Sequence, residues 1–204
     1  MEIHDVPCTV AALIEEERIV EVRLESDQEK SILGNIYTGQ VENIASNIQA
    51  AFVQIEPGKR CYYPLAEAQR AVFSAGRKGN GPLLPALTSN LNFTGRYLVL
   101  TTGDKKFGLS SKLTQEDRRR LSGWLKEEAD RPDKEFGIIV RTNAADASKE
   151  EILKELEWLK GRYHKAVVQG RNRTCFSLVL ETEPFYVAAV RDAYGRDLDE
   201  IITD

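Results

Sequence analysis

Apolar and polar residues alternate along the first third of the chain in a way that predicts β-strands. In the segment IVEVRL, residues 19–24, apolar and charged side chains take turns, which is the period of two expected of a half-buried strand. With residues 8–15 it predicts a hairpin that turns around Glu16 and Glu17. Three further apolar segments with Gly and Asn between them fit a small barrel or sandwich better than a helical layer; they are residues 35–44, 49–55 and 60–65.

The pattern changes in the second half of the chain. Residues 74–85 are rich in Gly and Pro and predict a loop, after which residues 96–103 and 107–113 return to strand character. Two segments then show apolar residues at the 3.6-residue spacing of a helix, residues 114–130 and residues 150–167. The last unit is predicted to be strand 175–181, helix 184–195 and strand 197–203, and such a unit is able to share a sheet with the N-terminal hairpin. The fold class is therefore mixed α/β, of the α+β type.

The net charge of −4 hides a basic middle section. Between residues 35 and 113 there are nine Lys and Arg against four acids, or +5, which leaves 19 basic and 28 acidic residues, or −9, elsewhere. A basic section in an acidic chain indicates a polyanionic partner at one face. Solvation alone also accounts for a block of this size, so both interpretations stay open.

Several function classes lack their usual signatures. Cys8, Cys61 and Cys175 show no metal-ligand spacing, and we expect reduced structural thiols and no metal site. His4 and His164 are the only histidines, and the nucleophile and phosphate-loop motifs GxSxG and Walker A do not occur. The sequence has no apolar run long enough for a membrane span and no signal-peptide pattern at its start. We expect a cytoplasmic protein with no membrane contact.

The segment AAFVQIEPGKRCYYPL places aromatic and basic residues together in the predicted β region. Phe52 lies on one strand, Tyr62 and Tyr63 lie on the next, and Lys59 and Arg60 lie at the turn between them. Exposed rings beside cations suit single-stranded nucleic acid, because bases stack on the rings while cations follow the backbone. Phe52 is alternatively a core residue. The two tyrosines cannot both be, because neighbours on a strand point to opposite faces.

A polar pair stands where the apolar strand 136–140 gives way to a helix. Arg141 and Thr142 follow the strand, and Ser148 with Glu151 has the spacing of a capping box that starts the helix. A solvated surface turn is one interpretation of the pair. The other is an anion site, in which a guanidinium and a hydroxyl bind a phosphate.

Four stretches, in this order and spacing, resemble the ribonuclease E/G family over nearly the whole chain. They are NIYTGQVENI with QAAFVQI, LTSNLNFTGRYLVL with FGLSSKL, GIIVRTNAADAS, and AAVRDAYGRDLDEIITD. In that family an RNase-H-like layer is interrupted by an S1-type OB-fold barrel and a 5′-sensor region. The resemblance therefore implies an RNase-H-like subdomain at 1–34 and 174–204, an S1-type region at 35–95 and a 5′-sensor-like α/β region at 96–173.

The resemblance also implies roles for individual residues. Phe52 and Tyr62 match the aromatic RNA platform of the barrel, with Lys59, Arg60 and Lys112 as further RNA-binding cations. Arg141 and Thr142 match the pair that contacts the 5′-monophosphate of the RNA. The implied function is the RNA-binding part of an endoribonuclease that processes single-stranded RNA and senses its 5′-monophosphate.

The chain departs from the family pattern in three respects. The residues SAGRKGNGPLLPALTSN stand where the last two barrel strands belong, so we expect a shortened barrel. Ser111 and Lys112 replace a basic pair before the sensor helix. The magnesium-binding aspartates of the family lie in a DNase-I-like subdomain beyond the matched segments. This chain alone is therefore predicted to be inactive and to hold no cofactor. The resemblance implies Mg²⁺ for the full-length enzyme. The cysteines that link subunits through zinc in some members also lie beyond them, which leaves self-association to the full-length enzyme.

Two alternatives to this interpretation remain. One is a stand-alone RNA-binding or regulatory module, and the other is a structural scaffold that does not bind RNA. RNA affinity and its dependence on salt separate these possibilities.

Overall fold

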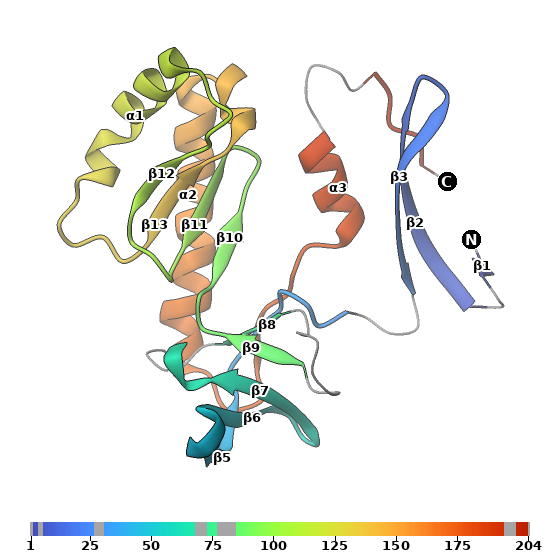
Figure 1. Ribbon diagram of the computed structural model, residues 1–204, viewed down its shortest axis with the longest axis vertical. Coiled ribbons are helices and arrows are strands. Elements are labelled where there is room, and N and C mark those ends of the chain that lie inside the picture. The colour runs from blue at the N-terminus through green and yellow to red at the C-terminus, as the bar shows by residue number, and fades with distance from the viewer. Residues whose placement is uncertain are drawn as a thin grey trace. The chain divides into compact units, whose positions relative to one another are not determined.

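The computed structural model describes residues 2–3, 6–26, 31–67, 73–76, 85–193 and 199–203, and the chain divides into two units (Figure 1). One unit consists of Met1–Ile32 with Thr182–Asp204, and the other consists of Leu33–Glu181.

The first unit contains the predicted N-terminal hairpin. Its strands are β1 (Glu2–Ile3), β2 (Val6–Glu15) and β3 (Arg18–Ser26), and they pair antiparallel in that order. Glu16 and Glu17 form the turn with φ of 48° and 62°, because a two-residue hairpin loop needs left-handed backbone at both positions.

The helix expected near the C-terminus is confirmed as α3 (Phe185–Ala193). The final strand is not. Residues 199–203 have no regular structure, and residues 194–198 of the predicted helix and strand lie outside the described residues.

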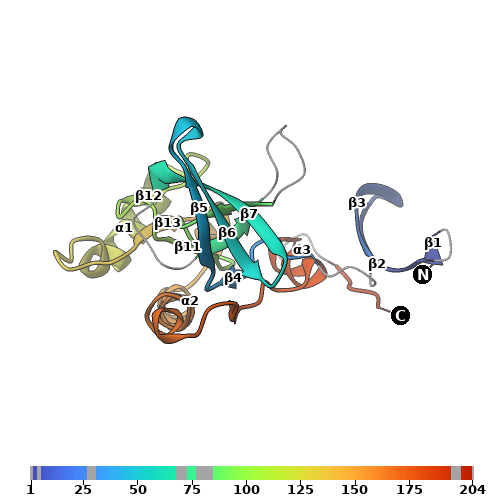
Figure 2. The same ribbon diagram turned by 90° about the horizontal axis from the view of Figure 1, so that it is seen from below.

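The second unit begins with a seven-stranded sheet. In pairing order its strands are β14 (Leu178–Leu180), β4 (Ile36–Tyr37), β8 (Phe73–Gly76), β9 (Ala86–Thr88), β7 (Lys59–Pro64), β6 (Ala50–Glu56) and β5 (Gln40–Ala45). All neighbours are antiparallel except β7 and β9. Figure 2 shows β5, β6 and β7 side by side.

This sheet curls back on itself. Only Thr38 and Gly39 separate β4 from β5, although β5 is at one end of the pairing order and β4 is next to the other. At this bend a Cβ on Gly39 would lie 2.7 Å from Val53 Cγ1 and 2.9 Å from the Gln54 carbonyl oxygen. The close approach of β6 therefore requires glycine.

The prediction of a barrel without its last two strands is wrong. Strands β8 and β9 occupy this part of the chain and pair antiparallel, with Ser74 opposite Thr88 and Gly76 opposite Ala86. The Tyr62 amide donates to the Pro85 carbonyl over 2.9 Å, which ties β9 to β7. Backbone pairing needs no particular side chains, so the Gly- and Pro-rich composition concealed both strands.

Strand β14 also differs from the prediction, because it pairs with β4 and not with the N-terminal hairpin. Thr38 explains the choice. Its Oγ1 donates to the Thr174 carbonyl over 2.6 Å, its amide donates to the Ser177 carbonyl, and its carbonyl accepts from the Phe176 amide. These bonds hold residues 174–177 beside β4.

A second sheet with two helices completes this unit. Its strands, in order, are β10 (Asn92–Thr94), β11 (Leu98–Thr101), β13 (Gly137–Val140) and β12 (Phe107–Leu109). The helices are α1 (Gln115–Ala129) and α2 (Lys149–Tyr163). Short helical turns are η1 (Ser46–Ile48), η2 (Leu65–Glu67), η3 (Thr142–Asp146), the π-helical η4 (His164–Gln169) and η5 (Gly170–Asn172).

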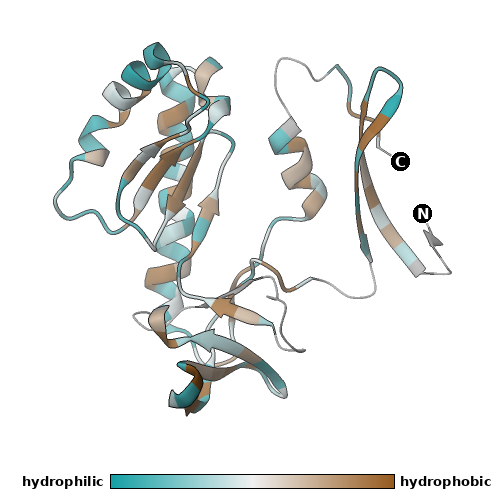
Figure 3. Cartoon of the chain, viewed as in Figure 1, coloured by the Kyte–Doolittle hydropathy of each residue, from teal (hydrophilic) through white to brown (hydrophobic). Residues whose placement is uncertain are grey.

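Both helices pack on one face of this sheet. Leu98, Leu100 and Val140 are completely buried in the same cluster as residues of α1 and α2, whereas Ile139, whose side chain points to the opposite face, is 43% exposed. Figure 3 shows the apolar residues along β11 and β13 and the polar residues that dominate α1. The result is a two-layer arrangement with one core.

The start of each helix follows from its capping residues. Thr114 Oγ1 accepts from the Asp117 amide at the start of α1. At α2 the predicted capping box is confirmed, because Ser148 Oγ accepts from the Glu151 amide and the Glu151 carboxylate accepts from the Ser148 amide. The capping box fixes where α2 begins, and thereby where η3, the turn that follows Arg141, has to end.

Candidate functional site

The outer face of β6 and β7 carries the two aromatic residues singled out from the sequence. Phe52 lies opposite Tyr62, and Gln54 lies opposite Arg60, so these four side chains share one face of the sheet. Phe52 and Tyr62 are half-buried, which excludes the interpretation of Phe52 as a core residue. We call Phe52, Gln54, Arg60 and Tyr62 the aromatic face.

Tyr63 points the other way, as the strand alternation required. It is 4% exposed, and its hydroxyl lies 3.0 Å from Ser89 Oγ in the interior. Cys61 shares that inner face and is completely buried. Burial raises the pKa of the Cys61 thiol to about 11, so this cysteine is a structural thiol.

Arg60 of the aromatic face and the neighbouring Lys59 each have a carboxylate partner. Arg60 Nε bonds to Glu42 Oε2 over 2.5 Å, with the guanidinium carbon 5.9 Å from the centre of the Phe52 ring. Lys59 Nζ lies 3.2 Å from Glu56 Oε2. Both pairs are largely exposed, and exposed pairs contribute about 0–1 kcal/mol. A phosphate can therefore replace either carboxylate at small cost.

The Arg141–Thr142 pair lines a hollow of about 420 Å³ that shares no residue with the aromatic face. The loop after β12 supplies Ser110 and Ser111, and the end of β13 supplies Arg141 and Thr142. Ser110 Oγ and Thr142 Oγ1 are 2.9 Å apart. We call these four residues and the hollow that they line the Arg141 pocket; Ile139, Val140 and Asn143 complete its lining.

Arg141 is held in place by the turn between β10 and β11. Its amide donates to the Tyr97 carbonyl over 2.7 Å, and its Nη1 donates to the Gly95 carbonyl over 2.6 Å. These two bonds fix both the backbone and the guanidinium relative to the residues 95–98 turn.

Glu155 of α2 fixes this turn from the other side. Its Oε1 accepts from the Tyr97 and Leu98 amides, each over 2.7 Å, and its Oε2 accepts from the Arg96 amide over 2.8 Å. A Cβ on Gly95 would collide with the Glu155 carboxylate, so a larger residue there would displace that carboxylate from the turn.

The sequence analysis missed Ser110, Gly95 and Glu155. Ser110 lies inside the predicted strand 107–113 and Gly95 directly precedes the predicted strand 96–103, and no motif distinguishes either residue. Lys112, which was predicted to bind RNA, is exposed and does not line the Arg141 pocket, although its amide donates to Ser110 Oγ over 3.3 Å.

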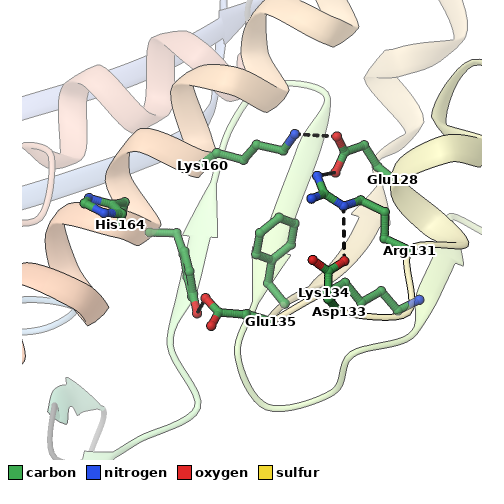
Figure 4. A pocket seen from close by; sticks show the side chains of 9 residues that line it. Glu128, Arg131, Asp133, Lys134, Glu135, Lys160 and His164 are labelled. Atoms are coloured by element: carbon green, nitrogen blue, oxygen red, sulfur yellow. Dashed lines mark hydrogen bonds and ion pairs between the residues drawn. The ribbon is translucent and has the colours of Figure 1, made fainter.

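A larger hollow of about 540 Å³ lies between the C-terminal ends of α1 and α2 (Figure 4). Lys160 Nζ is 2.6 Å from Glu128, which also lines this hollow, and 2.9 Å from Glu157, which does not. Burial lowers the pKa of Lys160, but the hydrogen bonds that its ammonium donates to these two carboxylates outweigh burial and raise that pKa overall. Tyr163 donates to Glu135 over 2.8 Å at the other side of this hollow. These contacts join the two helices.

The described part of the chain holds no group of three or more His, Cys, Asp and Glu side chains that could bind a metal ion. None of its helices combines the length and apolar character needed to cross a membrane.

Comparison with known proteins places the chain among ribonucleases. It is 27% identical over 218 residues to ribonuclease E of Nostoc sp., covering 96% of this chain and 31% of the relative. It is 25% identical over 218 residues to ribonuclease E of Escherichia coli, covering 95% and 20%, and 25% identical over 225 residues to ribonuclease G of the same organism, covering 96% and 45%. The chain thus spans less than half of the length of each of these relatives.

The family follows from a second comparison. The model of the Ribonuclease E/G family matches residues 92–204, which are more than half of the chain. The chain belongs to the ribonuclease E/G family, as the four sequence stretches predicted.

Proposed function

We propose that this chain is the part of a ribonuclease E/G-type endoribonuclease that binds single-stranded RNA and recognises its 5′-monophosphate. The observation that carries the proposal is the Arg141 pocket, where residues 31 positions apart in sequence, Ser110 and Arg141, line one hollow. Its donor set of one guanidinium and three hydroxyls matches a phosphate monoester, which offers three acceptor oxygens and a charge near −2.

The curled sheet supports the proposal of an S1-type OB fold. When β4 and β5 are counted as one bent strand, β6 to β9 bring the total to five, the number in an OB-fold barrel, and β7 and β9 form its parallel pair. Such barrels bind oligonucleotides on an exposed strand face. The aromatic face is on β6 and β7 and supplies two rings for base stacking. Residues 96–173, together with β10 just before them, then form the 5′-sensor region, and the first unit forms the RNase-H-like layer.

Catalysis belongs to the complete enzyme in this proposal. Mg²⁺ and its carboxylate ligands would be supplied by a catalytic segment outside the aligned region, and the enzyme would act in the cytoplasm, with self-association a property of the complete protein. The 204-residue chain binds RNA and leaves it intact.

The experiment compares the affinity of the chain for two versions of one single-stranded oligonucleotide, with a 5′-monophosphate and with a 5′-hydroxyl. A hydrogen bond to a charged group contributes about 1.5–3 kcal/mol, so we expect the monophosphate to bind about tenfold more tightly. Arg141→Ala abolishes this preference. Arg119→Ala is the matched control, because Arg119 is exposed on α1 and its loss changes the charge equally. Equal affinity of the parent chain for both ends refutes 5′ recognition.

The aromatic face has its own test. Phe52→Ala and Tyr62→Ala each remove one stacking ring and should weaken binding to either oligonucleotide by about 1–3 kcal/mol. The carboxylate partners of Lys59 and Arg60 favour the alternative of a structural scaffold. A parent chain that binds neither oligonucleotide at low salt supports the scaffold and excludes RNA binding.

A further inference from the structure

The outward face of α2 carries an exposed tryptophan between basic side chains. Trp158 is 45% exposed. Lys154 precedes it by four residues and Arg162 follows it by four, so the three side chains lie on one face of the helix. We propose that this face, with Lys165 one turn further on, is an additional contact surface for single-stranded RNA. The inference rests on the proposed RNA-binding function and extends it to a surface that the function does not require.

Trp158 has no packing role comparable to that of Trp124. Trp124, the other tryptophan of the chain, is half-buried and packs against the core of this unit. Three of the buried residues of α2, Ile152, Leu156 and Tyr163, lie on the side of the helix away from Trp158. A large aromatic residue exposed on a polar helix face is therefore available for stacking, in the way single-stranded nucleic acid uses aromatic side chains.

The surroundings of Trp158 favour a polyanion. The guanidinium carbon of Arg162 lies 5.0 Å from the centre of its ring, which places a cation beside any base stacked there. Lys154 and Lys165 are exposed, and no carboxylate of the described residues forms an ion pair with either. A Cβ on Gly161, which lies between Trp158 and Lys165, would meet nothing within 4 Å, so the helix surface there is open.

The acidic residues of α2 do not cancel this charge pattern. Glu155 accepts three backbone N–H groups of the residues 95–98 turn, and Glu151 binds the Ser148 cap. Glu157 bonds to Lys160 on the side that faces α1. These three carboxylates are thus bound to groups of the protein itself. Glu150, one turn before Lys154, is exposed, so this face carries three cations and one such carboxylate.

The dimensions suit a short stretch of one strand. Lys154 and Lys165 are eleven residues apart, or about 16 Å along a helix. A stacked strand rises about 3.4 Å per nucleotide, so this face spans up to about five nucleotides. Figure 2 shows α2 nearly end-on, at the periphery of the unit that contains it.

Trp158 itself is the reporter for the first experiment. In a Trp124→Phe variant, Trp158 is the remaining tryptophan, and we expect its fluorescence to be quenched when an oligoadenylate of about 12 nucleotides with a 5′-hydroxyl end is added. The reciprocal variant, Trp158→Phe, reports from Trp124 and should show little quenching. Binding of the oligoadenylate without a change in Trp158 fluorescence overturns the proposal.

The second experiment measures how affinity depends on salt. The triple variant Lys154→Gln, Arg162→Gln, Lys165→Gln should reduce the slope of log affinity against log salt by about 2, since each phosphate contact on a single strand contributes about 0.7. A control with the same charge change replaces Lys105, Lys106 and Lys126, which are exposed elsewhere in this unit, by Gln and should keep the parent slope. Equal slopes for the two triple variants overturn the proposal.

Failure of this inference is distinguishable from failure of the proposed function. If Phe52→Ala weakens RNA binding while both α2 experiments show no effect, the aromatic face binds RNA and the α2 face does not. If the parent chain binds no oligoadenylate, both proposals fail together. Quenching of Trp158 with an unchanged affinity for Phe52→Ala supports the α2 face and refutes the aromatic face.

Discussion

Replacing Glu155 by glutamine is expected to loosen the turn that holds Arg141. The Glu155 carboxylate accepts three backbone N–H groups, two at Oε1 and one at Oε2. Glutamine keeps one carbonyl oxygen but presents an NH₂ group in place of the other. That group cannot accept the Arg96 amide, so one bond is lost and the remaining two change from charge-assisted to neutral.

The loss can be estimated from these three bonds. A hydrogen bond to a charged group contributes about 1.5–3 kcal/mol, and a neutral one contributes about 0.5–1.5 kcal/mol. One lost bond and two weakened ones sum to roughly 3.5–6 kcal/mol, and water reaches this part-buried site in the variant, which offsets part of that loss. We therefore expect Glu155→Gln to lower the free energy of unfolding by about 2–4 kcal/mol.

Urea unfolding followed by tryptophan fluorescence measures this change, because Trp124 and Trp158 both belong to the Leu33–Glu181 unit. Glu157→Gln is the control. It makes the same chemical change on the same helix, one residue before Trp158. The Glu157 side chain is 71% exposed and, among the described residues, bonds only to Lys160. An exposed ion pair of this kind contributes about 0–1 kcal/mol.

Equal destabilisation by the two variants would refute the assignment of Glu155 as the residue that holds the turn. A second result would refute the link to Arg141. If Glu155→Gln destabilises this unit as expected but leaves the preference for a 5′-monophosphate unchanged, the turn does not position the guanidinium, despite its bonds to Gly95 and Tyr97.

Three further predictions concern stability and reactivity. The Ser148 cap lowers the pKa of Glu151 from 4.5. The stability that this carboxylate contributes should therefore be present above pH 4.5 and should disappear as the pH falls through the lowered pKa. Acid titration of the parent and Glu151→Gln chains checks this, because their free energies of unfolding should converge at low pH. Burial and a raised pKa of about 11 should make Cys61 unreactive toward a thiol reagent at pH 8 until the chain unfolds, whereas the exposed Cys175 should react at once. Counting the fast-reacting thiols of a Cys8→Ser variant checks this. Thr38→Val should lower the free energy of unfolding by about 2 kcal/mol, because it removes the hydroxyl that bonds to residues 174–177; an unchanged urea midpoint would show that other contacts hold β14.

Elements with strong local periodicity could be predicted from the sequence. The hairpin β2–β3 and helices α1 and α2 follow from the spacing of their own apolar residues, and the start of α2 follows from Ser148 and Glu151. The pairing of β8 with β9 and of β14 with β4 could not be predicted in this way. Those pairings depend on backbone groups brought together by the rest of the fold, such as the bonds of Thr38 to a segment 136 residues away.

The candidate site residues also divide into those that the sequence singled out and those that it did not. Phe52 and Tyr62 could be proposed as candidates because aromatic residues beside cations have a recognised chemistry, whereas the phosphate role predicted for Arg141 came from the family resemblance. Glu155 was hidden, because a glutamate on a charged helix normally faces solvent. Its position beside the buried stripe, one residue before the buried Leu156, is the one signal that the sequence offers.

The contacts of Arg141 bear on how tightly the pocket could hold a phosphate. A flexible arginine loses side-chain entropy when it binds, at about 0.5–1.5 kcal/mol for an immobilised side chain. In this chain the bond from Arg141 Nη1 to the Gly95 carbonyl, and the Glu155 bonds that fix the turn behind it, order the guanidinium before any ligand arrives. Ser110 and Thr142 order each other through their mutual hydroxyl contact. In the proposed complex a phosphate would therefore meet donors that are already aligned, with the cost of aligning them met during folding. On this reasoning, changes at Glu155 weaken phosphate recognition without removing any group that touches the phosphate.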